Sequence, residues 1–446
     1  MRKRVLVGLS VAVATTLAFG FSRAQGPTEV TLLFWPGPES EAMQKILDGY
    51  NKGQGLKDGV SVKQLLFSRQ GYFEKEETDL AAGSKEFDLG LVTTYTLGRY
   101  APYLAPIDGY LNKASIKGFL PSAVSSLNFG GKQYGVPTDV SNHFTYYRKD
   151  LVQKLLTNAA WKARYGEISQ KILGKAMAPK VPSAWTWDDF VATALFFTKS
   201  INPDSPTTYG SALQMKNLLF NIMIWQSTLV SYGGDLFDKN GKSVIDSEAA
   251  RKGLAVYTTI AQNKATPPGS TNYEYAEANE ALRTGQAAVM LQWSAAFNEL
   301  NDADKSPLTA GKVGLAPMPA GPKGHKTHVH SLGIGLNKSS TKAAEAGKFL
   351  AYLGSEAAMK LYADAGGLPP VSSVLKSMAA QRPEFPIVAN HLGKYGFVVT
   401  GGTAAYAIPV YSALAEEFSA VWAGQKSADD ALKAAAEKMD KLAAGK

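Results

Sequence analysis

Short apolar runs alternate along this chain with segments of helical periodicity. Residues 29–35 are rich in β-forming residues and predict a strand, and residues 39–50 have apolar positions at helical spacing. The pattern then repeats, with strands predicted over residues 60–67 and 87–93 and a helix over residues 71–82 between them. This β-α-β-α-β order predicts an α/β fold with a doubly wound, mostly parallel sheet, whose ligand site lies outside the carboxyl ends of its strands.

Polar residues mark several helix starts further along the chain. Thr186, Ser247 and Ser427 each precede acidic residues at the start of a helical pattern. A hydroxyl oxygen there can accept from free backbone amides, and the acids lie at the positive end of the helix dipole. These three positions are therefore interpreted as structural caps.

The N-terminus has the organisation of a secretory signal peptide. Arg2, Lys3 and Arg4 precede an uncharged apolar run over residues 5–21, and Ser22-Arg23-Ala24 places small residues where a signal peptidase reads. We expect residues 1–24 to be a signal peptide cleaved after about Ala24. An uncleaved anchor is the alternative, because the apolar run approaches the ~20 residues that span a bilayer.

The chain contains no cysteine. It can therefore form no disulfide and has no lipid-acceptor cysteine behind the cleavage site. The expected location is the periplasm, with free secretion as the second choice. Cleavage would leave 43 basic and 38 acidic residues, a net charge of +5, scattered without a basic stripe, so no nucleic-acid partner is expected.

Patterns typical of catalysis are missing from the sequence. It has no Gly-x-Ser-x-Gly elbow and no Gly-x-x-x-x-Gly-Lys-Ser/Thr phosphate loop, and its adjacent acid pairs lie on predicted helices, where neighbours diverge by about 100°. We therefore expect no enzyme activity and no cofactor. His325, His328 and His330 could form a metal site, but no acid accompanies them, and a polar turn leading into a strand over residues 331–336 is the simpler interpretation.

The remaining aromatic and polar residues suit a neutral polyhydroxylated molecule. Such a molecule needs flat aromatic side chains for its C–H faces and carboxylates or amides for its hydroxyls. Stacking candidates are Trp35, Tyr95, Trp225, Trp293 and Tyr411, and hydrogen-bonding candidates are Glu39, Asp139 and Asn142. The alternative for any single tryptophan is packing in the core.

Six motifs then occur in the order found in one known family. They are Gly-Lys-Gln-Tyr-Gly-Val-Pro with Tyr-Tyr-Arg-Lys-Asp-Leu (131–151), Trp-Thr-Trp-Asp-Asp-Phe (185–190), Tyr-Gly-Gly-Asp-Leu-Phe (232–237), Leu-Arg-Thr-Gly-Gln-Ala-Ala-Val-Met (282–290), Val-Gly-Leu-Ala-Pro-Met-Pro-Ala-Gly (313–321) and Gly-Gly-Leu-Pro-Pro (366–370). In these motifs the mature chain resembles the extracellular sugar-binding proteins of ABC importers, the large two-lobed solute-binding family that includes maltose/trehalose-binding proteins.

That resemblance implies two doubly wound α/β lobes joined by a multi-strand hinge. The N-terminal lobe would comprise residues 27–138 and 331–378, and the C-terminal lobe residues 139–330 and 379–446, with crossings near Asp139, Ser331 and Ala379. Positions that match the family's cleft are Trp35, Glu39, Thr94, Tyr95, Asp139, Trp293, Gly367 and Tyr411. The chain departs from the family at Leu282 and in residues 92–94, so a maltodextrin-like site is not implied.

The resemblance further implies a monomer that binds a small carbohydrate and delivers it to the membrane permease of an ABC importer. Two other classes stay open. A binder of another solute, such as a polyol, anion or peptide, would share the lobed design, and Arg69, Arg99 and Arg148 keep an anion in consideration. An exported glycoside-active enzyme is the remaining alternative.

Overall fold

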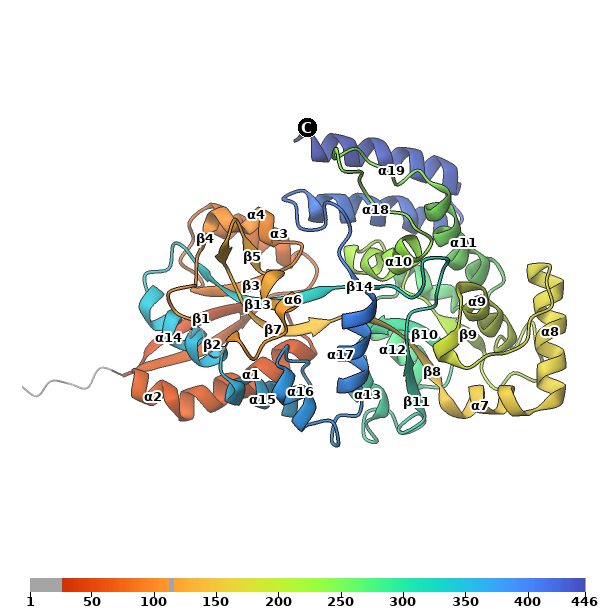
Figure 1. The fold of residues 1–446 in the computed structure, drawn as a ribbon, viewed down its shortest axis with the longest axis horizontal. Helices are drawn as coiled ribbons and strands as arrows, with labels where there is room; N and C mark the ends of the chain where they lie inside the picture. Colours follow the sequence, from red (N-terminus) through yellow and green to blue (C-terminus); the bar gives the residue numbers. More distant parts are fainter. Residues whose placement is uncertain (1–25, 112–115, 446) are drawn as a thin grey trace, which may run out of the picture.

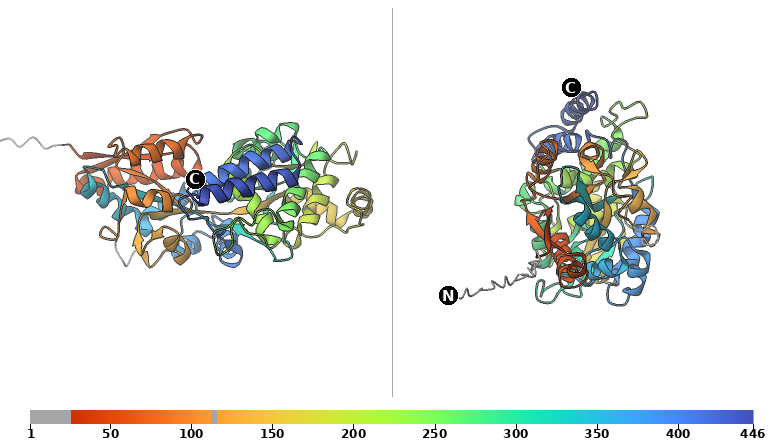
Figure 2. Two further views of the ribbon diagram at one scale, coloured as in Figure 1. Left: turned by 90° about the horizontal axis from the view of Figure 1, so that it is seen from above. Right: turned by 90° about the vertical axis from the view of Figure 1, so that its left-hand side faces the viewer.

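Two α/β bodies lie side by side along the longest axis of the molecule (Figures 1 and 2). The structure is a computed structural model, and it describes residues 26–111 and 116–445. The predicted signal peptide lies outside the described residues. Together with the family and the solved structures described below, the two bodies confirm the predicted α/β, two-lobed fold class.

The first body is built on a six-stranded sheet in the order β2-β1-β3-β13-β4, with β7 also paired to β13. β1 pairs in parallel with β2 and β3, as the β-α-β-α-β pattern predicts, and β13 runs antiparallel to β3, β4 and β7. Its strands are β1 (Thr28–Phe34), β2 (Val60–Leu66), β3 (Leu89–Thr93), β4 (Leu104–Ala105), β7 (Val136–Ser141) and β13 (His330–Asn337). Its helices are α1 (Pro38–Lys52), α2 (Gln54–Asp58), α3 (Tyr72–Ala81), α4 (Leu97–Tyr100), α6 (Pro121–Ser125), α14 (Ala343–Leu353), α15 (Glu356–Asp364) and α16 (Ser372–Ser377).

The second body contains a four-stranded sheet in the order β11-β8-β10-β9. Its strands are β8 (His143–Arg148), β9 (Tyr209–Ala212), β10 (Ala287–Trp293) and β11 (Val313–Ala316). Its helices are α7 (Lys149–Thr157), α8 (Ala159–Leu173), α9 (Trp187–Phe196), α10 (Leu219–Ser231), α11 (Glu248–Gln262), α12 (Tyr275–Arg283), α13 (Ala296–Asn301), α18 (Ala407–Trp422) and α19 (Ala428–Ala443). The last two helices lie against the second body in both figures, although they end the chain.

The chain crosses between the bodies at three places. β7 belongs to the first sheet and leads through Asn142 directly into β8 of the second. The return path runs through β12 (Thr327–His328) into β13, and a third passage leads from α16 to α17 (Glu384–Tyr395). β12 pairs with β14 (Gly396–Phe397). The exact lobe boundaries proposed from the resemblance stay predictions.

Short elements complete the part of the chain that the structure describes. They are β5 (Asn128–Phe129), β6 (Lys132–Gln133) and the 3₁₀ helices η1 (Ala101–Tyr103), η2 (Pro182–Ala184) and η3 (Pro268–Asn272). None of the helices in the described part of the chain has both the length and the apolar character that a bilayer span requires.

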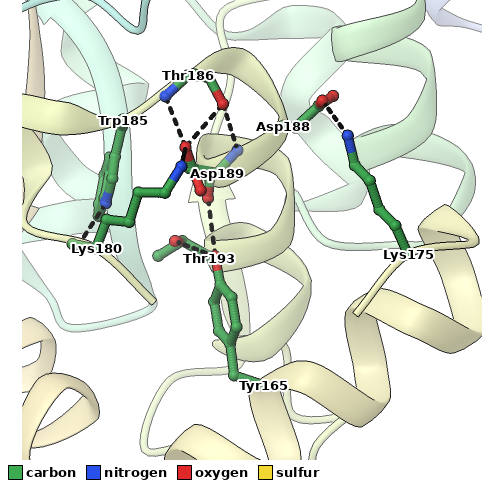
Figure 3. Close-up of polar contacts among 8 residues, drawn as sticks. All are labelled: Tyr165, Lys175, Lys180, Trp185, Thr186, Asp188, Asp189 and Thr193. Atoms are coloured by element: carbon green, nitrogen blue, oxygen red, sulfur yellow. Dashed lines mark hydrogen bonds and ion pairs between the residues drawn. The ribbon is translucent and has the colours of Figure 1, made fainter. Parts of the chain in front are cut away.

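The capping residues read from the sequence start their helices as predicted. The side chains of Thr186, Ser247 and Ser427 accept from the backbone N–H groups of Asp189, Ala250 and Asp430. Figure 3 shows the first of these caps, where Asp189 in turn accepts from the backbone N–H and the hydroxyl of Thr186. Local polar chemistry therefore sets the start of these helices.

Candidate functional site

A cavity lies between the two bodies, at the carboxyl ends of β1 and β10. The space between its lining side chains is about 360 Å³ when the part that is open to solvent is counted, but only about 20 Å³ of it admits a molecule the size of water. This is far below the ~300–1,000 Å³ of small-molecule sites, so a larger solute enters only if the two bodies move apart. The lining residues are Trp35, Pro38, Glu39, Arg69, Ser141, Phe220, Tyr275, Trp293 and His330.

Aromatic rings from both bodies form the walls of this cavity. Trp35 directly follows β1 and packs edge-on against Tyr72 of its own body at 5.2 Å and Phe220 of the second body at 6.1 Å. Trp293, the last residue of β10, lies 6.3 Å from Phe220 and 5.1 Å from the ring of His330. The two indoles are almost wholly covered, with 1% and 6% of their surface exposed. The structure therefore holds the two bodies close together around the cavity.

Several polar atoms at this interface are buried without a hydrogen-bond partner in the described part of the chain. Neither indole N–H donates, and both ring nitrogens of His330 and both amide atoms of Asn142 are unpaired. Each buried unpaired group of this kind costs about 1–3 kcal/mol, so native structures rarely gather several in one place. A polar guest that hydrogen-bonds to them would remove this cost.

Two charged residues of the cavity lining, Glu39 and Arg69, form a cluster with Glu274, which lies beside the lining residue Tyr275. Glu39 lies in the first turn of α1, Arg69 in the loop between β2 and α3, and Glu274 just before α12. Arg69 Nη1 lies 3.9 Å from Glu39 Oε2, and Nη2 lies 3.6 Å from Glu274 Oε1. Both distances exceed the usual ~2.7–3.2 Å of a hydrogen bond. The ion pairs are therefore open enough for hydroxyl groups to bridge them.

The histidines near the cavity are buried, contrary to the polar turn expected from the sequence. His328 and His330 are 1% and 4% exposed, because β12 and β13 carry them to the junction of the two bodies, where His143 also lies. Burial lowers the pKa of His328 to about 3 and holds the pKa of His330 well below its usual range. The imidazoles are therefore neutral, with lone pairs and N–H groups to offer. Among the described residues, no group of three or more His, Cys, Asp or Glu side chains could hold a metal ion.

Asp139 lies in β7 behind the cavity lining. Its carboxylate accepts from the Ser141 hydroxyl at 2.8 Å and from the backbone N–H of Leu368 at 3.0 Å. Burial, with the nearby charge of Glu39, raises the pKa of Asp139 to about 7. These contacts join β7 to the turn after α15, so Asp139 holds the first crossing in place.

The structure brings three of the nine predicted site residues to the cavity wall, namely Trp35, Glu39 and Trp293. Tyr95 lies one layer behind, with its ring 5.2 Å from that of His330 and 6.4 Å from that of Tyr411. Whether these five side chains bind a solute stays a prediction.

Four predicted residues, including Asp139, serve other contacts in this structure. Thr94 bonds across the sheet to the backbone of Ser331. Trp225 is fully buried in the second body, 4.6 Å from Phe418, and does not line the cavity. Gly367 lies in the turn after α15, where a Cβ would be 2.1 Å from the ring of Tyr362.

Six of the nine lining residues were not predicted to contact a neutral solute, although Arg69 was considered for an anion and His330 for a metal. Pro38 and Arg69 follow strand ends, so the same rule that selected Trp35 and Glu39 could have selected them. Phe220 and Tyr275 come from the starts of α10 and α12 in the second body, and nothing in the local sequence marks them. Ser141 and His330 lie on the crossing strands β7 and β13.

Two bodies that enclose a small cavity lined by aromatic rings and polar groups define a two-lobed solute-binding protein. The sequence model of the family "Bacterial extracellular solute-binding protein" matches residues 36–360, and the chain belongs to this family. A binding protein of Brucella abortus, whose full name specifies no solute, is 25% identical over 448 residues, 98% of this chain and 97% of its own. The mannitol-binding protein of Pseudomonas aeruginosa is 23% identical over 433 residues and 92% of each chain.

Solved structures share the fold along nearly the whole chain. Maltose-bound MalE3 of T. maritima superposes with a TM-score of 0.77 at 24% identity, covering 93% of this chain and 100% of its own. A solute-binding protein of an ABC transporter from Agrobacterium vitis, with bound D-mannitol, gives a TM-score of 0.76 at 23% identity and covers 93% and 98%. The family and the fold agree with the resemblance read from the sequence motifs.

Proposed function

We propose that this protein captures a carbohydrate or sugar alcohol in the cavity between its two bodies and delivers it, unaltered, to the permease of an ABC importer. The N-terminal segment and the absence of cysteine support an exported protein that is soluble in the periplasm after cleavage near Ala24. The proposed lobes are residues 27–138 with 331–378, and residues 139–330 with 379–446.

The observation that carries the proposal is the set of unpaired buried polar atoms between aromatic rings. Sugars and sugar alcohols combine apolar C–H faces with hydroxyls that both donate and accept. The rings of Trp35, Phe220 and Trp293 offer apolar surface, and the indole N–H groups, His330 and Glu39 offer donors and acceptors within the same cavity.

Closure couples binding to a change of shape. Trp35 and Glu39 belong to the first body, and Phe220, Tyr275 and Trp293 to the second. A solute touches both sets only when the bodies are close, so its binding energy favours the closed form. An affinity near 1 μM, about 8 kcal/mol, would allow capture and later release.

Relatives indicate which solutes to test first. A mannitol-binding protein and structures with bound mannitol and maltose are among the similar proteins. In the proposed site, Trp35, Glu39 and Trp293 contact the solute directly. Thr94, Tyr95, Asp139, Trp225, Gly367 and Tyr411 support it from behind or through the hinge.

A thermal-shift screen of the mature protein tests the proposal. The panel contains D-mannitol, D-glucitol, ribitol, erythritol, D-tagatose and maltose, with glycine, tripeptides and sulfate as non-carbohydrate controls. We expect a melting-temperature increase of several degrees with at least one sugar or alditol and a smaller radius of gyration in solution scattering. The bound solute should be recovered unchanged after long incubation. A shift with the controls alone, or conversion of the solute, would overturn the proposal.

A further inference from the structure

Arginines kept an anionic solute in consideration, and the structure shows what each of them does. Arg99 pairs with Glu77 at 2.6 Å and Arg148 with Asp150 at 2.6 Å, each within its own body and away from the cavity lining. Arg69 is therefore the one of these three that faces the cavity. The side chains around Arg69 determine whether an anion can bind there.

The guanidinium of Arg69 lies between aromatic rings of the two bodies. Its Cζ atom is 5.2 Å from the centre of the Trp35 ring and 5.0 Å from that of Phe220 on α10. A guanidinium within about 6 Å of a ring face is attracted by the ring quadrupole. Arg69 thus bridges the bodies through its planar face as well as through its charge.

The two carboxylates beside Arg69 also come from different bodies. Glu39 belongs to α1 of the first body and Glu274 precedes α12 of the second. The side chains of Glu39, Glu274 and Arg69 are 12%, 17% and 28% exposed, so solvent screens them only in part. One cation faces two carboxylates, which leaves the cluster with an excess of negative charge.

The unpaired atoms of this cluster define the chemistry that fits it. Arg69 Nε, Glu39 Oε2 and Glu274 Oε1 are buried without a hydrogen-bond partner among the described residues. A hydroxyl group can accept from the guanidinium and donate to a carboxylate at the same time, whereas an ionised carboxyl group only accepts. An anionic guest would therefore leave Glu39 and Glu274 unpaired and would face their charge.

We propose that Arg69 is an interlobe latch whose charge is balanced by Glu39 and Glu274, so that the site takes uncharged polyhydroxylated solutes and rejects the corresponding acids. The selectivity rests on the proposed function, whereas the latch stands on the structure alone. Arg69 holds the bodies together over the solute, and the two carboxylates keep it from acting as an anion receptor.

Solution scattering of the solute-free protein tests the latch. Arg69→Met keeps a long apolar side chain but removes the interlobe ion pair, and Arg99→Met removes an ion pair within the first body. We expect the radius of gyration to rise in Arg69→Met and to stay at the wild-type value in Arg99→Met. An unchanged radius in Arg69→Met would overturn the role of Arg69 as a latch.

Two series of solutes that differ in one functional group test the selectivity. The first is D-glucitol, D-gluconate and D-glucamine, which differ at one end of the chain. The second is D-glucose with its C6 acid D-glucuronate and its C2 amine D-glucosamine. We expect the acids to bind at least tenfold more weakly than the neutral members, and Glu274→Gln to reduce this ratio to about threefold or less. Glu280→Gln, which removes a charge elsewhere on α12, should keep the wild-type ratio.

The scattering comparison and the solute series distinguish failure of this inference from failure of the proposed function. Acids that bind as tightly as the neutral members, or a ratio that Glu274→Gln leaves unchanged, would overturn the inference while the proposed function stands. If no sugar or alditol in these series or the screening panel binds, the proposed function fails, and the scattering comparison still decides the role of Arg69.

Discussion

At the residue scale, the site depends on a few side chains with unusual hydrogen bonding or an unusual pKa. Two indoles are buried with unpaired N–H groups, and burial raises the pKa of the Asp139 carboxyl group behind them to about 7. Such groups are costly in a protein that binds nothing, because unpaired buried polar atoms destabilise the closed form. Each of them gives a measurable signal.

Trp293 should report solute binding directly. Replacing it with phenylalanine keeps an aromatic face but removes the indole N–H, so we expect the affinity for the solute found in the screen to fall about tenfold, the cost of one hydrogen bond. The binding-induced change of tryptophan fluorescence should also shrink. Trp422→Phe, which changes a ring stacked on Tyr257 in the second body, should leave both properties unchanged. An undiminished affinity in Trp293→Phe would contradict the proposed contact.

Burial is the main cause of the raised pKa of Asp139, and the charge of Glu39 should contribute to it. Burial and the charge of Glu39 raise the pKa of Asp139 to about 7. Removing that charge in Glu39→Gln is expected to lower the pKa of Asp139, which carboxyl ¹³C chemical shifts can follow. Glu41→Gln, on the exposed side of the same helix, is the control and should leave the pKa in place.

At the element scale, buried caps and tight turns fix where helices begin and end. The crossing strands β7 and β13 carry Ser141 and His330 of the cavity wall, the turn after α15 bonds to β7, and the α9 cap lies within the second body. The contribution of each cap or turn to the free energy of unfolding depends on the contacts of single residues, which differ sharply even between neighbours in the sequence.

The start of α9 provides a matched pair of aspartates. Asp189 is fully buried and accepts from the backbone and hydroxyl of Thr186 and from the ammonium of Lys180, whereas Asp188 is exposed and paired with Lys175 (Figure 3). We expect Asp189→Ala to lower the free energy of unfolding by about 2 kcal/mol through loss of the cap and its buried bonds. Asp188→Ala should change it by less than about 0.5 kcal/mol. Urea denaturation measures both, and equal effects would contradict the assignment.

Gly367 is required by packing in the turn that bonds to Asp139. An added Cβ would lie 2.1–2.7 Å from atoms of the Tyr362 ring, which is itself buried. Gly367→Ala should therefore destabilise the protein by about 1–3 kcal/mol, as overpacking does. Gly393→Ala, at an open position of α17, is expected to stabilise slightly because alanine favours a helix. Thermal unfolding distinguishes the two.

The same scale shows what the sequence could predict. The strands over residues 29–35 and 60–67 were correct to within a residue or two, because apolar runs bounded by Pro and Gly specify buried strands locally. Trp35 and Glu39 could be found because they directly follow β1. Phe220, Tyr275 and the burial of His328 could not, since α10, α12 and β12 meet the first body only through tertiary packing.

At the scale of the whole molecule, the junction of the two bodies affects both the stability at acid pH and the order in which the parts of the fold can form. His143, His328, His330 and His391 are all buried near the junction. Burial, the largest cause for each, lowers their pKa values, to about 3 for His328 and about 4 for His391. Such groups remain neutral in the folded protein and take up protons on unfolding.

Stability should therefore fall as the pH drops below the ordinary histidine pKa of 6.5. A depressed histidine pKa means that the unfolded state binds more protons, which costs about 1.4 kcal/mol per pH unit for each group. Asp139 and Glu76 act in the opposite direction, because burial raises their pKa values. Four histidines against two acids predict a net loss between about pH 6.5 and pH 4.

Urea unfolding across this pH range measures the loss. His391→Gln should flatten the dependence by about one proton. A stability that rises toward pH 4 would contradict the buried, neutral state of the histidines.

The position of β13 has a consequence for how the protein assembles. This strand lies between β3 and β4 in the first sheet, where Leu332 pairs with Thr93, yet the chain makes it only after β8 to β12 of the second body. Pairings between residues so distant in sequence fold slowly, because a long loop must close before any contact compensates for the lost entropy. A ribosome-bound or truncated chain that ends before residue 330 would leave an edge of β3 bare. The sheet of the first body therefore begins with the earliest strands of the chain but is completed only after the strands of the second sheet have been synthesised.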